Sequence, residues 1–314
     1  MIEVAKKSIN FIALGTYNKL ENFIHNYIPL NSQNQFINRL NSLQQIRHRE
    51  YVQNHIRYDF QYIPNKISSI NNSILRNTLL SHFTRLFEGK LPDAFFSFNY
   101  NPRVSDLYLK GVRQKGHKQE DLSSYDIERY LFNPLVKNGK IIVYNKSFFL
   151  CKITNNFITY YNNKFSSIPH HTPILREILS IQHESFSIET PVWLYLSNRQ
   201  EYLTGHIDLN LTSKNIIYVS DYKSSITDMI RSLPQVSTYG LLLGNNLNNT
   251  NNSFNFKINC VTFSKDLAYS YNPNILNKEI LDFVKLMNKK RNNRLMDRSG
   301  NDLEDLIKEI IYNL

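Results

Sequence analysis

The stretch from residue 201 to residue 239 most strongly limits how this chain folds, because it contains two strand patterns followed by one helix pattern. Residues 216–223 read Ile-Ile-Tyr-Val-Ser-Asp-Tyr-Lys, and β-branched and aromatic residues of this kind favour a buried strand. Residues 201–208 form a second strand pattern, and a short polar link predicts an antiparallel hairpin. A helix is expected over residues 226–243, with a kink or local break at Pro234.

Polar side chains gather at one end of this predicted hairpin. Side chains alternate along a strand, so Asp221 and Lys223 share one face, and the hairpin register places Asp208 beside Asp221. Gln235 and Tyr239 are four residues apart and project from one face of the helix. Two clustered carboxylates that are buried without a partner are unfavourable, so the pair predicts a bound cation.

Two carboxylates suit Mg²⁺ or Mn²⁺, which completes its coordination with water and substrate phosphate. Water bound to such an ion is acidic enough to become a nucleophile. Lys223 is placed to orient that water or to neutralise charge that develops on phosphate. The segment therefore predicts a metal-dependent site that acts on phosphate esters.

Three short motifs occur in order: Gly205-x-x-Asp208, Asp221-x-Lys223 and Gln235-x-x-x-Tyr239. This order resembles the PD-(D/E)XK nuclease superfamily, most closely its RecB-like branch, over about residues 166–265. The resemblance implies a restriction-endonuclease-like core, a mixed sheet flanked by helices in the order helix, three strands, helix, strand. It also implies metal binding by the two aspartates, catalysis by the lysine, and support of the substrate or metal site by the glutamine and tyrosine.

RecB-like nucleases often carry a histidine metal ligand on the helix before the core sheet. The resemblance therefore suggests His171 as a third metal ligand, with His170 as the first alternative. His183 and His117 stay open as further alternatives. Glu189 begins the first core strand, and its role is unassigned.

The positive charge of the chain is unevenly distributed. The net charge is +11; residues 1–165 contain 22 Lys+Arg against 11 Asp+Glu, and residues 166–314 contain 15 of each. A basic half joined to a metal-carboxylate half fits an enzyme that acts on a polyanion. We expect DNA as the partner, either single-stranded or with free ends.

Two basic stretches are candidates for the contact with DNA. The first lies in an irregular segment, where the expected contact residues are Lys110, Arg113, Lys115 and Lys118. The second is an expected basic helix with aromatic residues, spanning Arg47 to Arg57, which reads equally well as a solvated helix face.

A polar connector at residues 162–169 is the expected boundary between a basic N-terminal region, residues 1–165, and a nuclease core, residues 166–314. The N-terminal region is expected to be mainly helical, with a small β-meander. Its expected elements are helices within residues 18–60, 67–88 and 123–135 and the meander at 140–161. Around the central segment, the core is expected to contain strands at 185–196 and 254–263, a loop at 244–253, and helices at 277–290 and 303–314.

Cysteine is scarce, with only Cys151 and Cys260. Two cysteines imply no disulfide framework and cannot form the four-cysteine iron–sulfur site of some RecB-like nucleases, so no such cluster is expected. No run of 18 apolar residues predicts a transmembrane helix, and no signal peptide is recognised. We expect an intracellular protein in a reducing compartment, the cytoplasm or an organelle, and not a secreted one.

The expected activity is Mg²⁺- or Mn²⁺-dependent hydrolysis of DNA phosphodiester bonds by an exonuclease or end-processing enzyme, in DNA repair or recombination. The resemblance of the Gln-x-x-x-Tyr motif to the RecB-like branch favours DNA over RNA. Two alternatives stay open. One is a site-specific endonuclease, and the other is a DNA-binding protein whose nuclease fold is catalytically dispensable.

Overall fold

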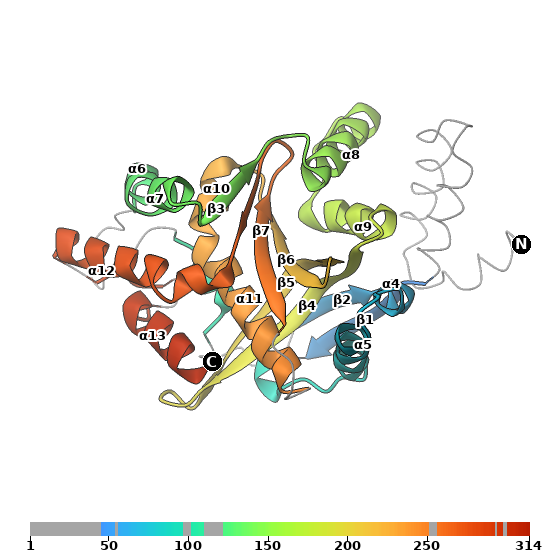
Figure 1. The fold of residues 1–314 in the computed structure, drawn as a ribbon, viewed down its shortest axis with the longest axis horizontal. Helices are drawn as coiled ribbons and strands as arrows, with labels where there is room; N and C mark the ends of the chain where they lie inside the picture. The colour runs from blue at the N-terminus through green and yellow to red at the C-terminus, as the bar shows by residue number, and fades with distance from the viewer. Residues whose placement is uncertain are drawn as a thin grey trace, which may run out of the picture.

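Eight strands of the described chain form one mixed sheet with helices packed around it (Figure 1). The computed structural model describes residues 45–53, 56–96, 102–109, 122–250, 256–292, 294–297 and 300–314. The strands are β1 (Arg47–Gln53), β2 (Ile56–Tyr62), β3 (Ile141–Tyr144), β4 (Ser185–Leu196), β5 (Glu201–Ser213), β6 (Ile216–Tyr222), β7 (Lys257–Phe263) and β8 (Ala268–Tyr271). Their spatial order is β1-β2-β4-β5-β6-β7-β8-β3, with β6 and β7 parallel and the other neighbours antiparallel. The predicted α/β class, a mixed sheet flanked by helices, is confirmed.

Helices alternate with these strands along the chain and pack on both faces of the sheet. They are α4 (Pro64–Ser68), α5 (Ser73–Phe87), α6 (Ser124–Ile127), α7 (Asn133–Lys137), α8 (Phe149–Phe165), α9 (His171–Ile181), α10 (Ile226–Arg231), α11 (Leu233–Asn248), α12 (Glu279–Arg291) and α13 (Leu303–Asn313). Shorter turns are η2 (Asp93–Phe96), η3 (Val104–Leu107), η5 (Pro273–Leu276) and a π-helical turn, η4 (Glu128–Phe132). Among the described residues, no helix combines the length and the apolar character that crossing a membrane requires.

The order helix, three strands, helix, strand that the resemblance implies is present as α9, β4, β5, β6, α11 and β7, with the short α10 inserted between β6 and α11. The β5–β6 hairpin turns through Lys214 and Asn215, which both have positive φ, 49° and 64°. Positive φ at both turn residues gives the twist that matches two antiparallel strands. Because a parallel neighbour needs a crossover, α10 and α11 carry the chain from β6 to β7.

The sheet separates two hydrophobic clusters. One contains buried residues of α5, α11, α12 and α13, and the other contains buried residues of α8 and α9. Cys260 and Val261 are consecutive in β7 and belong to different clusters, because neighbouring side chains of a strand point to opposite faces. Both faces of the central strands are therefore covered.

The prediction of helix through residue 60 is wrong for the described residues, since 47–62 form the β1–β2 hairpin. Phe60 and Tyr62 have the two-residue period of a strand, both are fully buried, and their rings stack with centroids 5.4 Å apart. Phe83 of α5 packs on both rings. Residues 18–44 of the expected helical stretch lie outside the described residues. The hairpin extends the core sheet, because β2 pairs with β4.

The predicted β-meander at residues 140–161 is also wrong, since only β3 is a strand there and α8 follows it. The Asn145 side chain accepts a hydrogen bond from the Ser147 backbone N–H at 2.9 Å, which turns the chain into the helix. Leu150, Thr154 and Phe157 are buried at helical spacing. β3 pairs with β8 at the far edge of the sheet. Strands from both sides of the connector expected at residues 162–169 therefore belong to one sheet.

The helix predicted over residues 226–243 is two helices, α10 and α11, which meet at Ser232. Pro234 does not kink a helix, because it lies in the first turn of α11, where its missing N–H leaves no bond unmade. Ser225 caps α10, with its hydroxyl accepting from the Asp228 N–H at 3.1 Å. α11 continues to Asn248, so the first half of the loop expected at residues 244–253 is helical.

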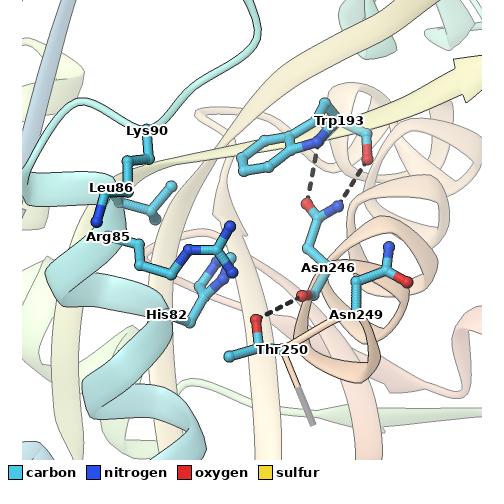
Figure 2. Close-up of a pocket in the computed structure, with 8 residues that line it drawn as sticks. All are labelled: His82, Arg85, Leu86, Lys90, Trp193, Asn246, Asn249 and Thr250. Carbon is cyan, nitrogen blue, oxygen red and sulfur yellow. Dashed lines mark hydrogen bonds between the residues drawn. The ribbon is translucent and has the colours of Figure 1, made fainter. Parts of the chain in front are cut away.

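One side chain of α11 replaces a missing strand beside β4. β2 pairs with β4 at Ser187 and Ile188, and among the described residues no strand pairs with the outer edge of β4 at Trp193. Asn246 covers this edge (Figure 2): the Trp193 N–H donates to Asn246 Oδ1 at 3.1 Å, and Asn246 Nδ2 donates to the Trp193 carbonyl at 2.8 Å. The amide thus pairs with the edge as a neighbouring peptide would.

We expect Asn246→Ala to lower the free energy of unfolding by about 1–3 kcal/mol, because it leaves two backbone groups of Trp193 unpaired. Asn248→Ala is the control, since Asn248 is exposed at the end of the same helix. Its expected effect is within about 0.5 kcal/mol. Urea unfolding of both variants measures the difference. Equal effects of the two substitutions would contradict the edge-pairing role of Asn246.

His82 of α5 lines a pocket of about 180 Å³ between α5, β4 and the end of α11 (Figure 2). The side chain is 3% exposed, its Nε2 has no hydrogen-bond partner among the described residues, and its ring stacks on Trp193. Burial, followed by the positive charge of Arg85, lowers the pKa of the imidazole from 6.5 to about 4. His82 is therefore neutral in the folded protein at neutral pH.

We expect His82 to make the fold less stable in mild acid. The unfolded chain takes up the proton near pH 6.5 and the folded chain near pH 4, so stability is lost as the pH falls between these values. The full loss is about 3 kcal/mol by pH 4. In His82→Gln this contribution is absent, so unfolding free energies of the two proteins measured from pH 7 to pH 4.5 should converge in acid. Parallel pH curves would show that His82 does not titrate in this way.

Candidate metal centre

Two aspartates meet where β5 and β6 run side by side. The register pairs Leu209 with Ser220, so Asp208 and Asp221 occupy the next position of each strand. Asp208 is 7% exposed and Asp221 is 1% exposed. The backbone N–H of Tyr222 donates to Asp208 Oδ2 at 3.2 Å and fixes that carboxylate. The predicted hairpin thus brings the two carboxyl groups together.

Lys223 follows directly after β6 and lies on the same side as Asp221, as the two-residue period predicts. Its Nζ is 2.8 Å from Asp221 Oδ2, and its side chain is 20% exposed. Its backbone N–H donates to the Phe263 carbonyl at 2.9 Å, which continues the parallel ladder beyond the end of β6. The ammonium group is therefore held beside the carboxyl pair by regular backbone geometry.

Among the four candidate histidines, His171 reaches this cluster. It is the first residue of α9, and its Nε2 is 2.7 Å from Asp208 Oδ2. His170 is the N-cap residue of the same helix and makes no side-chain cap bond. His183 follows the helix end, and His117 lies outside the described residues.

Glu189, whose role the sequence left unassigned, is part of the centre. It lies in β4, and its Oε1 is 3.9 Å from His171 Nδ1. Its φ is +52°, a backbone conformation that costs about 1–3 kcal/mol for a residue with a side chain and that often marks functional sites. An available sequence signal was an acidic residue within an otherwise apolar strand pattern.

His206, which was not predicted, lies on the other side of Glu189. Its Nδ1 is 3.2 Å from Glu189 Oε2, and its side chain is 45% exposed. Burial lowers the pKa of His206, and the positive charges of His171 and Arg103 lower it further. The negative charge of Asp208 acts in the opposite direction and raises it, but the net shift is downward. The sequence offered no sharper signal than its position two residues before Asp208.

Three carboxyl groups and two basic side chains determine the charge of the centre. Burial, followed by the negative charge of Asp208, raises the pKa of both Glu189 and Asp221. Burial alone would also raise the pKa of Asp208, but the positive charges of His171 and Lys223 outweigh it and lower that pKa. Burial lowers the pKa of His171, yet the neighbouring carboxylates raise it to about 9. His171 and Lys223 thus supply positive charge that the carboxyl groups require as long as no metal ion is bound, and a bound ion would replace the proton of His171.

The donor set fits a divalent metal ion. One ligand atom from each of His171, Glu189 and Asp208 lies within 4.8 Å of the others, close enough for one ion to bind all three. Oδ1 of Asp221 is buried and has no hydrogen-bond partner among the described residues. Carboxylates with one imidazole and no thiolate suit Mn²⁺ or Mg²⁺.

Gln235 and Tyr239 lie on one face of α11, as predicted, and bind each other: Gln235 Nε2 donates to the Tyr239 hydroxyl at 3.1 Å. Both are buried, and burial raises the pKa of Tyr239 well above its usual value. Gly205 is required by this packing, because a Cβ at that position would meet Tyr239 Cε1 at 2.6 Å. The glycine of the first motif therefore makes room for the tyrosine of the third.

The predicted DNA-contacting residues Lys110, Arg113, Lys115 and Lys118 lie outside the described residues. The structure does describe Leu109 and Leu122, the nearest residues on either side of this segment. The Leu109 N–H donates to the Arg231 carbonyl at 3.0 Å, and Arg231 Nη2 donates to the Leu122 carbonyl at 3.1 Å. Both flanks therefore meet at the end of α10, the helix that follows Lys223.

In the alternative basic stretch, Arg47 to Arg57, some side chains pack within the protein. Arg49 Nη1 donates to the Phe87 carbonyl at 2.7 Å, and its guanidinium lies over the ring of Tyr51. Tyr51 is 8% exposed, and its hydroxyl donates to the Leu86 carbonyl. Tyr51 is therefore not exposed for base stacking, whereas the side chains of Arg57 and Tyr58 lie outside the described residues.

No protein-family model, no curated protein and no solved structure matches this chain.

Proposed function

We propose that this protein is a metal-dependent nuclease that hydrolyses DNA phosphodiester bonds, an exonuclease or end-processing enzyme of the RecB-like PD-(D/E)XK type. One observation carries the proposal: Asp208, Asp221 and Lys223 converge at the junction of β5 and β6, with Lys223 Nζ 2.8 Å from Asp221. Carboxylates alone would suit a structural metal ion. A lysine held against them gives the site a group for transition-state charge.

Asp208, Asp221, Glu189 and His171 would hold the ion. Bound Mg²⁺ or Mn²⁺ would supply an acidified water and a positive charge facing the scissile phosphate. Lys223 then holds its ammonium group beside Asp221, where it orients the attacking water or stabilises negative charge on the phosphate oxygens. Gln235 keeps the Tyr239 hydroxyl in place under this centre.

DNA is the proposed substrate on two grounds. The resemblance of the Gln235–Tyr239 motif to the RecB-like branch favours DNA, and the excess of Lys and Arg lies in residues 1–165. Nucleic-acid phosphates attract such a basic region with a strong dependence on salt. The Leu109 and Leu122 backbones, which flank the basic segment at 110–118, both contact Arg231 at the end of α10, the helix that follows Lys223, and this supports a DNA contact on that side.

The proposal is tested with purified protein, Mg²⁺ or Mn²⁺, and end-labelled linear single strands, linear duplexes and closed circles. Products that start only at open ends are expected, and they support an exonuclease. Cut circles would instead establish an endonuclease. Binding without cleavage of any substrate in either metal would favour the DNA-binding alternative. An Asp208→Asn preparation, purified in parallel, controls for contaminating nucleases.

A further inference from the structure

A row of side chains extends from the metal centre along one face of β5. Thr204 and His206 alternate with buried residues of the other face and so point to the same side of the sheet, and His206 contacts Glu189 of the metal centre. Residues two apart in a strand are separated by about 7 Å. This matches the spacing of successive phosphates along an extended nucleic-acid strand. A strand whose scissile phosphate lies at Asp208 can therefore follow this row.

Arg103 joins the far end of the row from a distant part of the sequence. Its Nη1 donates to Thr204 Oγ1 at 2.9 Å, and the Thr204 N–H donates to the Pro102 carbonyl at 3.2 Å. The next residue, Val104, is fully buried against Gly205 of β5. Arg103 is therefore held on β5 by side-chain, backbone and packing contacts, so its guanidinium is positioned before any ligand binds.

His206 lies between Arg103 and the metal centre. Its contact with Glu189 at 3.2 Å orients the ring, while 45% of the side chain faces solvent. Pro191 pairs with His206 across β4 and β5, so the carboxylate beside the ring comes from Glu189, two residues earlier in β4. Beyond the three carboxyl groups, this stretch of β5 thus presents an imidazole and then a guanidinium.

We propose that Arg103 and His206 bind the backbone phosphate adjacent to the scissile phosphate, and so position the nucleic-acid strand along β5. The inference rests on the proposed nuclease function, whose substrate it places. A guanidinium presents several N–H donors in a planar fork that fits phosphate oxygens, and its preorganisation on Thr204 lowers the cost of that contact. Arg103 and His206 are positioning residues, whereas Lys223 faces the reacting phosphate.

The test compares wild type, Arg103→Gln, Arg103→Lys and His206→Gln. A matched control is Arg294→Gln, which removes one guanidinium from the exposed connection between α12 and α13. Binding to a fluorescent single-stranded oligonucleotide is measured by anisotropy with Ca²⁺ at several salt concentrations. We expect Arg103→Gln to weaken binding several-fold and to reduce the slope of log affinity against log salt by about 0.7. Arg103→Lys should keep the wild-type slope, and Arg294→Gln should leave affinity unchanged.

A second readout separates a phosphate contact from a structural effect. Oligonucleotides that carry one uncharged methylphosphonate, moved along the strand, should reveal a position that weakens wild-type binding. At that position, the methylphosphonate should not weaken the binding of Arg103→Gln any further, and it should weaken the binding of His206→Gln less than that of the wild type. If both variants keep the wild-type salt slope and the wild-type methylphosphonate profile, the inference is overturned. Cleavage by the wild type with Mn²⁺ tests the nuclease proposal separately. If the wild type does not cleave but its methylphosphonate profile depends on Arg103, the nuclease proposal fails and the proposed path of the strand along β5 is retained.

Discussion

Asp208→Asn should abolish cleavage and, with it, the stabilisation of the protein by metal. In the wild type, Mn²⁺ at about 100 times its Kd should raise the free energy of unfolding by about 2.7 kcal/mol, because only the folded chain assembles the ligands. The variant replaces a carboxylate that contacts His171 and lies in the donor set. Its amide oxygen can still accept the hydrogen bond from the Tyr222 N–H, so the fold should persist. Thermal unfolding with and without Mn²⁺, together with a nuclease assay, measures both effects.

Asp266→Asn is the control for this experiment, because Asp266 has an exposed carboxylate paired with Lys265 and is not in the donor set. It should retain wild-type cleavage and the full shift of the unfolding temperature with Mn²⁺. An Asp208→Asn protein that still shifts with Mn²⁺ as the wild type does would exclude Asp208 as a ligand. Wild-type cleavage by that variant would exclude the proposed centre altogether.

Lys223→Gln should separate catalysis from metal binding. The rate should fall by about 10²–10³-fold, because the ammonium group acts on charge that develops in the transition state. The shift of the unfolding temperature with Mn²⁺ should remain, since the lysine is not in the donor set. The Lys223→Gln substitution also removes a cation that competes with the metal for Asp221. Single-turnover cleavage and thermal unfolding distinguish the two effects.

Lys265→Gln provides the matched control, since it removes an equivalent charge from a lysine that is 47% exposed. Its cleavage rate should match the wild type. A Lys223→Gln protein that cleaves at the wild-type rate would remove Lys223 from the mechanism. If it instead loses the response to Mn²⁺, the lysine supports the metal site rather than the reacting phosphate.

The sequence alone determined the parts of the centre that local backbone geometry controls. Asp221 and Lys223 share a face because strand side chains have a period of two, and Gln235 meets Tyr239 because helix side chains four apart are neighbours. Asp208 reaches Asp221 because a short turn sets the register of the hairpin. These relations span few residues, so the pattern of residue types was enough to predict them.

Misassigned elements were those whose local pattern fits two structures. Residues 47–62 contain apolar and aromatic residues at spacings that suit a helix, but pairing of β2 with β4 and packing on α5 select the hairpin. Residues 149–165 are rich in β-branched and aromatic residues, yet burial of one helical face against α9 selects α8. Propensity is weak beside such tertiary contacts, which sequence patterns do not contain.

Only the tertiary structure decided which further residues complete the centre. Glu189 reaches His171 through the pairing of β4 with β5 and a positive φ that its residue type does not favour. His171 was one of four candidate histidines until the placement of α9 put it 2.7 Å from Asp208. Arg103 joins β5 across about a hundred residues of sequence, through a bond to Thr204 and the burial of Val104. Contacts at such separations depend on how the whole chain packs, and no local period records them.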